Sequence, residues 1–205
     1  MDMRISKGEI FERVFVNEEV NLQIDQEAGS HVKIHVINAS FSITVNQLGE
    51  GCITEIYGLE NLHGDESVTA ETHVTHAVGG GTSNQLVKFV LADNSRGSFI
   101  GDLKIAPDAQ QTEAHQTNRN LLLSEDAEMR TRPQLEIYAD DVKATHGAST
   151  GQLDESALFY MQQRGIDKQK ARQLLVNAFM KEVVETISDE KIKSDVLLLF
   201  EEEAF

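Results

Sequence analysis

Short runs of alternating apolar and polar residues fill most of the first 146 positions of this 205-residue chain. Alternation with a period of two places one face of a strand in a core and the other in water. Turn residues separate the runs at intervals of about ten residues, which is typical of a sandwich, a barrel or a solenoid. The runs are Val20–Ile24, Val32–Val36, Phe41–Val45, Ile53–Tyr57, Leu86–Leu91, Phe99–Ile105 and Leu135–Tyr138.

No stretch of helical period interrupts this region, which argues against ordinary βαβ units. The chain has only two prolines, Pro107 and Pro133, and strand interiors nearly free of proline are compatible with many continuous ladders. No exact internal repeat is visible. A β-solenoid does not require one, because each coil needs only inward apolar residues and turns that fit.

The period changes after Gly151. Asp154 is a plausible N-cap for a first helix, with Gly165 as the residue that ends it. Asp167 and Ser188 are the expected caps of a second and a third helix. The second helix has an apolar stripe with steps of three and four residues, made of Ala171, Leu174, Leu175, Ala178, Phe179 and Val183. The apolar face of the third consists of Ile192, Val196, Leu199 and Phe200. We therefore expect a β domain over residues 1–150 and a helical domain over residues 151–205.

Composition restricts the partners. The net charge is −16, from 34 acidic and 18 basic residues, and phosphate binding needs concentrated Lys and Arg, so nucleic acid is a poor partner. The excess acid favours either a cationic partner or mere solubility. No window approaches the roughly 18 consecutive apolar residues of a membrane span, and the N-terminus lacks the apolar region of a secretory signal. The single cysteine, Cys52, excludes an intramolecular disulfide, and we expect a cytoplasmic location.

Few residues match known catalytic motifs. Gly79–Gly81 lacks the lysine of a nucleotide-binding loop, so we expect a turn there and no bound nucleotide. Cys52 lies at a strand edge and is expected to be a small packing residue. His73 and His76 would point to opposite sides of a strand, whereas Glu71 and His73 share a side. The latter two could bind a metal or form part of an exposed ladder.

Two further features stand where the strands give way to helices. Asp140 and Asp141 could pair as acid and base, as in sugar-cleaving enzymes, or form a solvated turn. His146 follows among small and hydroxyl residues. From the residues alone it is a buried structural group, a metal ligand or part of a partner surface.

Several segments around this joint together resemble the SufB/SufD family of iron–sulfur cluster assembly proteins. The match is specific from about Leu59 to Lys181. The segments are Asn120–Ser124, Arg132–Ile137, Ala139–Lys143, His146–Ala148 and Phe159–Ile166.

The resemblance implies a right-handed parallel β-helix followed by a small helical domain, N-terminally shortened relative to the family. It also implies a non-catalytic scaffold that pairs with SufB through the β-helix and docks the ATPase SufC through its helices. Within this reading His146 is an interface ligand for iron or a nascent cluster shared with a partner chain. The helical residues expected to contact SufC are Phe159, Tyr160, Gln163, Arg164 and Gly165.

Three residue positions favour a SufD-type over a SufB-type chain or depart from the family. Gly147 stands where SufB-type members have a functional glutamate, and Gln116–Asn120 contains no cysteine. Ala144 replaces a cysteine that is frequent in SufD-type members, so a thiolate ligand is absent there and His146 stands alone.

Three alternatives remain at this stage. One is a β-helix carbohydrate lyase or hydrolase that uses Asp140 and Asp141. Another is a purely structural homodimer formed through the side of the solenoid. The helical stripe, in turn, could dock a partner or merely cap the open end of the solenoid.

Overall fold

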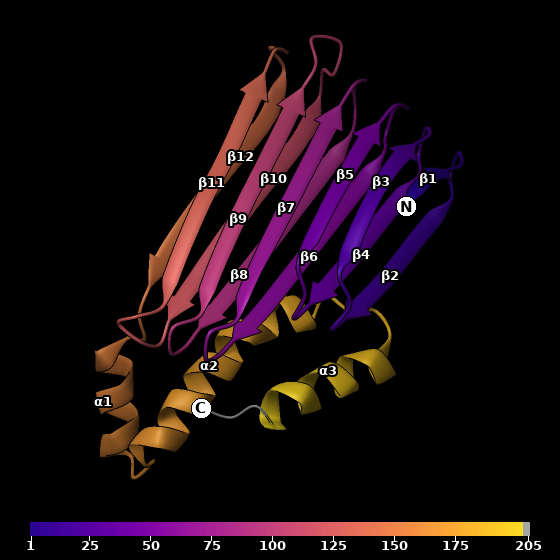
Figure 1. The fold of residues 1–205 in the computed structure, drawn as a ribbon. Helices are drawn as coiled ribbons and strands as arrows, with labels where there is room; N and C mark the ends of the chain where they lie inside the picture. The colour runs from indigo at the N-terminus through magenta and orange to yellow at the C-terminus, as the bar shows by residue number, and fades with distance from the viewer. Residues whose placement is uncertain (203–205) are drawn as a thin grey trace.

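A computed structural model describes residues 1–202 of the chain, and the side chains of residues 1–200. Within this range, twelve strands form two six-stranded parallel sheets, and three helices follow (Figure 1). The first sheet contains β1 (Asp2–Ile5), β3 (Val20–Gln26), β5 (Phe41–Gln47), β7 (Ser67–His76), β9 (Arg96–Ile105) and β11 (Glu128–Ile137). The second contains β2 (Ile10–Val16), β4 (His31–Ile37), β6 (Ile53–Leu62), β8 (Thr82–Leu91), β10 (Thr112–Leu122) and β12 (Val142–Gly151).

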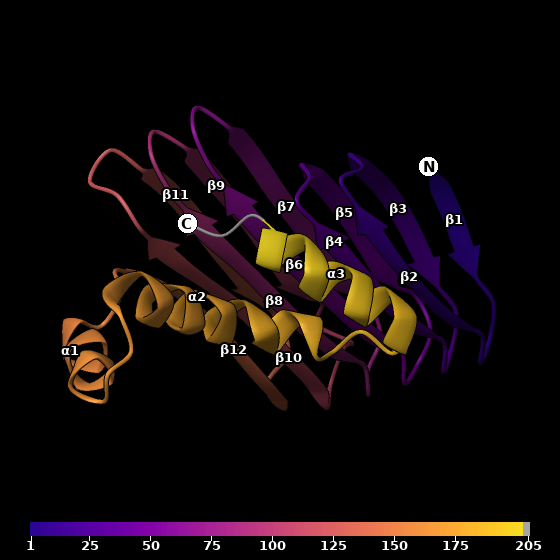
Figure 2. The same ribbon diagram turned by 90° about the horizontal axis from the view of Figure 1, so that it is seen from below.

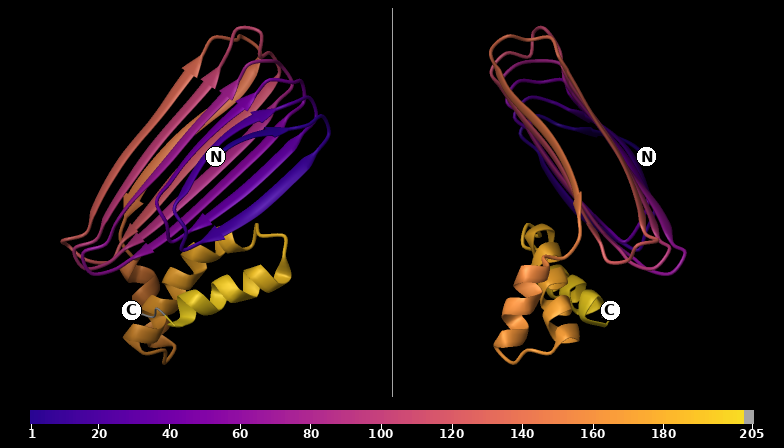
Figure 3. Two further views of the ribbon diagram at one scale, coloured as in Figure 1. Left: turned by 45° about the vertical axis from the view of Figure 1, so that its right-hand side comes forward. Right: turned by 90° about the vertical axis from the view of Figure 1, so that its left-hand side faces the viewer.

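The chain alternates between the two sheets, so each odd strand and the even strand after it form one coil of a flattened solenoid (Figure 3). The coils lengthen along the chain. Val20 pairs with Phe41 in the next coil, a step of 21 residues, whereas Ala70 pairs with Phe99, a step of 29. This change of period explains why no exact repeat is visible in the sequence.

The lumen between the sheets contains the main core. In register, Ile24 of β3 lies beside Val45 of β5, which lies beside Val74 of β7, and all three side chains are almost fully buried. Such columns of inward residues bury the apolar half of each alternating run. The predicted parallel β-helix-like fold is therefore confirmed, and the seven predicted runs all fall within or overlap strands. The seven runs leave out five strands, namely β1, β2, β7, β10 and β12.

Stacked turns join the sheets along the side of the solenoid that is remote from the helices. Gly80 has a φ of +70°, and its N–H donates to the carbonyl of Gln110 in the next turn, 2.9 Å away. Gly51 occupies the same place one coil earlier, with a φ of +68°. The Gly79–Gly81 segment is thus a turn, as predicted, and glycine meets the left-handed conformation without strain.

The helices are α1 (Glu155–Gln163), α2 (Lys168–Val184) and α3 (Glu190–Glu202). Two predicted caps are confirmed: the Asp154 carboxylate accepts from the N–H of Ser156, and that of Asp167 accepts from Lys170. Gly165 follows α1 with a φ of +84°. The third cap was assigned wrongly to Ser188. Asp189 caps α3 instead, accepting the N–H groups of Lys191 and Ile192, because its carboxylate lies one residue closer to the helix.

Helices α2 and α3 pack across the outer face of the second sheet (Figure 2). The predicted stripe of α2 is wrong in part, because Leu174 is 39% exposed and Ala178 is exposed as well. The buried face of this helix contains Ala171, Val176, Met180, Val183 and Val184. The predicted face of α3 is confirmed, with Val196 and Phe200 buried. Since the helices cover a sheet face, the idea that their stripe caps the open end of the solenoid is also wrong.

None of the helices within residues 1–202 has the length and apolar character needed to cross a bilayer.

Candidate functional site

His146 lies on β12, the edge strand of the second sheet. In register, it follows Gln85 of β8 and Gln116 of β10. Both glutamines are buried, and the Gln116 Nε2 donates to the Gln85 Oε1 at 3.3 Å. This column points into the lumen. The side chain of His146 is exposed because no further coil covers the last one, so the imidazole stands at the mouth of the lumen.

The residues around His146 leave it accessible. Its neighbour Thr145 faces outward and contacts His115, whose Nδ1 is 2.8 Å from the Thr145 Oγ1. An added Cβ at Gly147 would meet nothing within 4 Å. Ala144 lies beside buried Ala114 and supplies no ligand atom. The open end therefore presents one imidazole with free space around it.

The lumen beneath this mouth is polar for several coils. The Thr72 Oγ1, Gln85 Nε2 and Gln116 Oε1 atoms are buried and have no hydrogen-bond partner among the described residues. His76 lies deeper, with its Nε2 2.8 Å from the Ser83 Oγ. Burial lowers the pKa of His76 to about 4, so this imidazole is neutral at pH 7.

Both strands of the last coil have an unpaired edge. Among the strands of the described residues, β11 pairs only with β9, and β12 pairs only with β10. Unpaired backbone N–H and C=O groups on such edges can pair with strands of another chain.

The other sequence-predicted metal candidates do not assemble into a site. The His73 Nδ1 is 2.9 Å from Asp102, and its Nε2 is 3.9 Å from Glu71. Even so, no group of three or more His, Cys, Asp and Glu side chains in the described part of the chain could hold a metal ion. Cys52 is fully buried, with its Sγ 3.1 Å from the carbonyl oxygens of Glu27 and Gly49, which confirms a packing role.

Asp140 and Asp141 lie in the exposed turn between β11 and β12. The N–H of Asp141 donates to the Gln110 side chain at 2.9 Å. Asp141 also lines a groove with Glu50 and Asp108 at the row of stacked turns. The two aspartates thus belong to a hydrogen-bonded turn, which agrees with the solvated turn that the sequence offered as the alternative to an acid–base pair.

The predicted partner-binding residues lie together on and after α1. Phe159 and Tyr160 are 62% and 58% exposed. The Arg164 guanidinium donates to the Tyr160 hydroxyl at 2.7 Å and lies 4.9 Å from the centre of its ring. Gln163 and Gly165 are exposed beside them. This surface offers aromatic and cationic contacts that remain exposed among the described residues.

Sequence reasoning missed the ion pairs that fix α2 to the solenoid. The Lys88 side chain of β8 is 2% exposed. It forms an ion pair with Glu182 and donates to the carbonyl of Phe179 at 2.8 Å. Burial lowers the pKa of Lys88, and the hydrogen bond from Lys88 lowers the pKa of Glu182. A lysine inside the apolar run Leu86–Leu91 was the signal that a packed acidic partner must exist.

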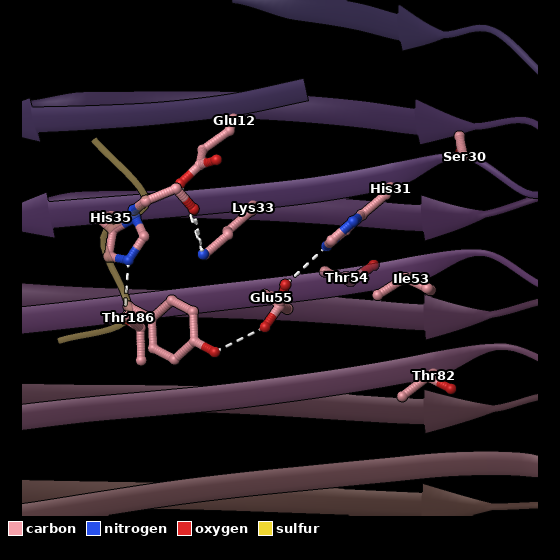
Figure 4. A network of polar contacts seen from close by, with 12 residues as sticks. Glu12, Ser30, His31, Lys33, His35, Ile53, Thr54, Glu55, Thr82 and Thr186 are labelled. Carbon is pink, nitrogen blue, oxygen red and sulfur yellow. Dashed lines mark hydrogen bonds and ion pairs between the residues drawn. The ribbon is translucent and has the colours of Figure 1, made fainter. Parts of the chain in front are cut away.

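A second network near the link between α2 and α3 was also missed (Figure 4). The Thr186 hydroxyl donates to the carbonyl of Val183 at 2.6 Å, and so accepts the His35 Nε2–H at 2.9 Å. The ring of His35 stacks on Tyr57 at 4.9 Å. Burial lowers the pKa of His35 to about 4. His31 lies on the same side of β4 as His35 and contacts Glu55 at 2.7 Å.

Comparison with known proteins shows which family this chain resembles in sequence. Residues 16–179 match the family model described as the SufBD core domain of SUF system FeS cluster assembly. The chain is 37% identical over 186 residues to the iron–sulfur cluster assembly protein SufD of Escherichia coli, covering 89% of this chain and 44% of the relative. It is 34% identical over 176 residues to the chloroplastic protein ABCI7 of Arabidopsis thaliana, covering 83% and 37%.

A third relative, the iron–sulfur cluster assembly protein SufD of Bacillus subtilis, is 31% identical over 159 residues, covering 77% of this chain and 36% of the relative. The chain thus spans less than half the length of these three relatives. The match nevertheless covers the coils from β3 to β12 and extends into α2. On this agreement of sequence and fold, the chain belongs to the SufB/SufD family.

Proposed function

We propose that this chain is a SufD-type scaffold component of iron–sulfur cluster assembly. The observation that carries the proposal is the open last coil, where His146 stands at the mouth of the lumen between two unpaired strand edges. The names of the E. coli and B. subtilis relatives, both cluster assembly proteins, support it. They also support a non-catalytic role. A cytoplasmic location stays a prediction, since one relative is chloroplastic.

Pairing with SufB would use the free edges of β11 and β12. Edge strands bind other chains by continuing the sheet, with main-chain hydrogen bonds as the source of affinity. Residues 145–151 of β12 are all exposed, so a partner strand could approach without displacing any packed element. The same edges could receive a second copy of this chain, which is the competing homodimer.

His146 would bind iron or a nascent cluster together with residues of the partner. A single imidazole cannot hold a cluster, and the described residues contain no group of three ligands. The position at the open end places the ligand where a partner's residues would meet it. The iron or cluster is here a cargo passed through the complex.

Docking of SufC would use the surface of Phe159, Tyr160, Gln163, Arg164 and Gly165. Aromatic and arginine side chains are enriched where protein interfaces derive most of their affinity. The two aromatic rings are more than half exposed, so a partner could contact both.

The test is co-purification with SufB and SufC, followed by iron analysis of the complex. We expect His146→Ala to retain both partners and to lose iron. The matched control is His115→Ala, which removes an imidazole from the outer side of the adjacent strand. This variant should retain both the partners and the iron. Full iron content and full complementation of a SUF-dependent strain by His146→Ala would refute the ligand role.

A second measurement separates SufB pairing from the homodimer. Analytical ultracentrifugation should show that SufB replaces any self-associated form of the chain. A homodimer that persists beside excess SufB would overturn the proposed pairing.

A further inference from the structure

The outer face of the first sheet contains a groove that the proposed function does not use. It lies at the start of β7, β9 and β11 and has a volume of about 390 Å³. Register places Ser67, Arg96 and Glu128 side by side across the three strands. The neighbouring Ser98 and Arg130 complete its polar lining.

Two arginines share one carboxylate in this groove. The Arg96 Nε and the Arg130 Nη2 lie 4.0 Å and 3.7 Å from the same Glu128 Oε2. Hydrogen-bonded ion pairs of this kind are about 2.7–2.9 Å long, so Glu128 is held loosely. All three side chains are more than half exposed, and such exposed pairs contribute at most about 1 kcal/mol.

The groove therefore has unused capacity for an anion. Each guanidinium carries five N–H donors, and Glu128 is the only ion-pair partner of both arginines among the side chains of residues 1–200. Arg132 adds a further positive charge two residues along the exposed face of β11. This cluster of positive charge stands out on a chain whose net charge is −16.

The lining indicates which kind of anion fits. Guanidinium forks match carboxylates in a bidentate geometry, and serine hydroxyls add donors. Small-molecule sites are mostly apolar and enclosed, whereas arginine, serine, glycine and the single Glu128 line this groove on the open face of a sheet. An extended protein segment suits such a face better than a small ligand does.

We propose that the Arg96–Arg130 groove binds an acidic segment of a protein partner, whose carboxylates take the place of Glu128. This proposal is independent of cluster binding at His146, because the groove lies on the outside of the solenoid.

The test measures binding of a fluorescent hexaglutamate peptide to the whole chain by anisotropy at low salt, with hexaglutamine as the neutral reference. Arg96→Gln and Arg130→Gln should each weaken binding about fivefold, or about 1 kcal/mol. Glu128→Gln should strengthen it, because the competing carboxylate is gone. The matched control is Arg4→Gln, which removes the same charge from the same sheet at a residue paired to Glu27 at 2.7 Å.

Equal losses in Arg130→Gln and Arg4→Gln would reduce the effect to overall charge and overturn the proposal. So would unchanged or weaker binding by Glu128→Gln. Inorganic phosphate should displace the peptide no better than acetate at equal ionic strength. Displacement by phosphate at much lower concentration would reassign the groove to a phosphate ligand. Circular dichroism of every variant checks that the exposed substitutions leave the fold intact.

Discussion

The two outer faces of the solenoid have the same backbone ladders, but helices cover one face and solvent contacts the other. On the second sheet, Ile37, Leu59 and Val90 point outward and are buried by α2 and α3. On the first sheet, most outward positions are polar, such as Thr44, His73 and Asp102 in one register column. Outward residue type thus decides whether a sheet face acquires a helical layer or stays in water.

The strand patterns record this difference. Strand β3 alternates buried and exposed residues, as a strand with one solvent-exposed face should. Strand β8 is buried continuously from Gln85 to Leu91, which is typical of a strand covered on both faces. A break in alternation within a solenoid therefore predicts where another element packs.

The largest test of this comparison is a matched pair of truncations on the two faces. Leu59→Ala removes a side chain that is fully buried beneath the helices. We expect a loss of about 2–5 kcal/mol in the free energy of unfolding, as for other buried Leu→Ala changes, measured by urea denaturation.

Its counterpart is Ile100→Ala, at an outward and only partly buried position of β9 in the first sheet. Here we expect a smaller loss, below about 2 kcal/mol, because part of the side chain already contacts water. Similar losses for the two variants would show that the helices do not make the outer face of the second sheet more important for stability than the solvent-exposed face of the first.

Acid should weaken the covered face. An unfolded histidine has a pKa of about 6.5, while burial lowers the pKa of folded His35 to about 4. Between these values the unfolded chain binds more protons than the folded one, so stability falls as the pH drops from about 6.5 to about 4. The full effect is roughly 3 kcal/mol, since each pKa unit corresponds to about 1.4 kcal/mol.

His76 should add a loss of the same sign from within the lumen, since burial lowers its pKa to about 4 as well. Urea denaturation at several pH values measures the combined slope. We expect His35→Gln and His76→Gln each to flatten it, and the double variant to flatten it further. Parallel pH profiles for the wild type and both variants would contradict the buried-histidine explanation.

Much of this fold could be predicted because the dominant signals are local. Alternation at Val20–Ile24 and Phe41–Val45 places those residues in strands without knowledge of the rest, and Asp154 and Asp167 cap helices through bonds to their own neighbours. The α2 face could not be read the same way. Leu174 and Val176 are both apolar, and only the position of the sheet decides that Val176 is the buried one.

In the candidate site, too, local sequence identifies residues, but only long-range contacts determine where they lie. The resemblance pointed to His146, but its place at the mouth of the lumen depends on the register with Gln116, set by residues 30 positions apart. The Lys88–Glu182 pair spans an even longer separation. No spacing rule brings such residues together, because the coils differ in length and the helical region folds back over earlier strands.

The smallest effect on stability is expected at α1, which lies beyond the covered face. Phe159 is 62% exposed, so Phe159→Ala should change the free energy of unfolding by less than about 0.5 kcal/mol. If this ring belongs to the surface of the chain that docks SufC, the same change should also weaken SufC binding by about tenfold, as loss of an interface aromatic commonly does. Leu158→Ala, at the buried neighbouring position, is the matched contrast and should lower stability more than Phe159→Ala. Unchanged SufC affinity in Phe159→Ala, together with unchanged stability, would leave the exposed ring without a role and remove it from the docking surface.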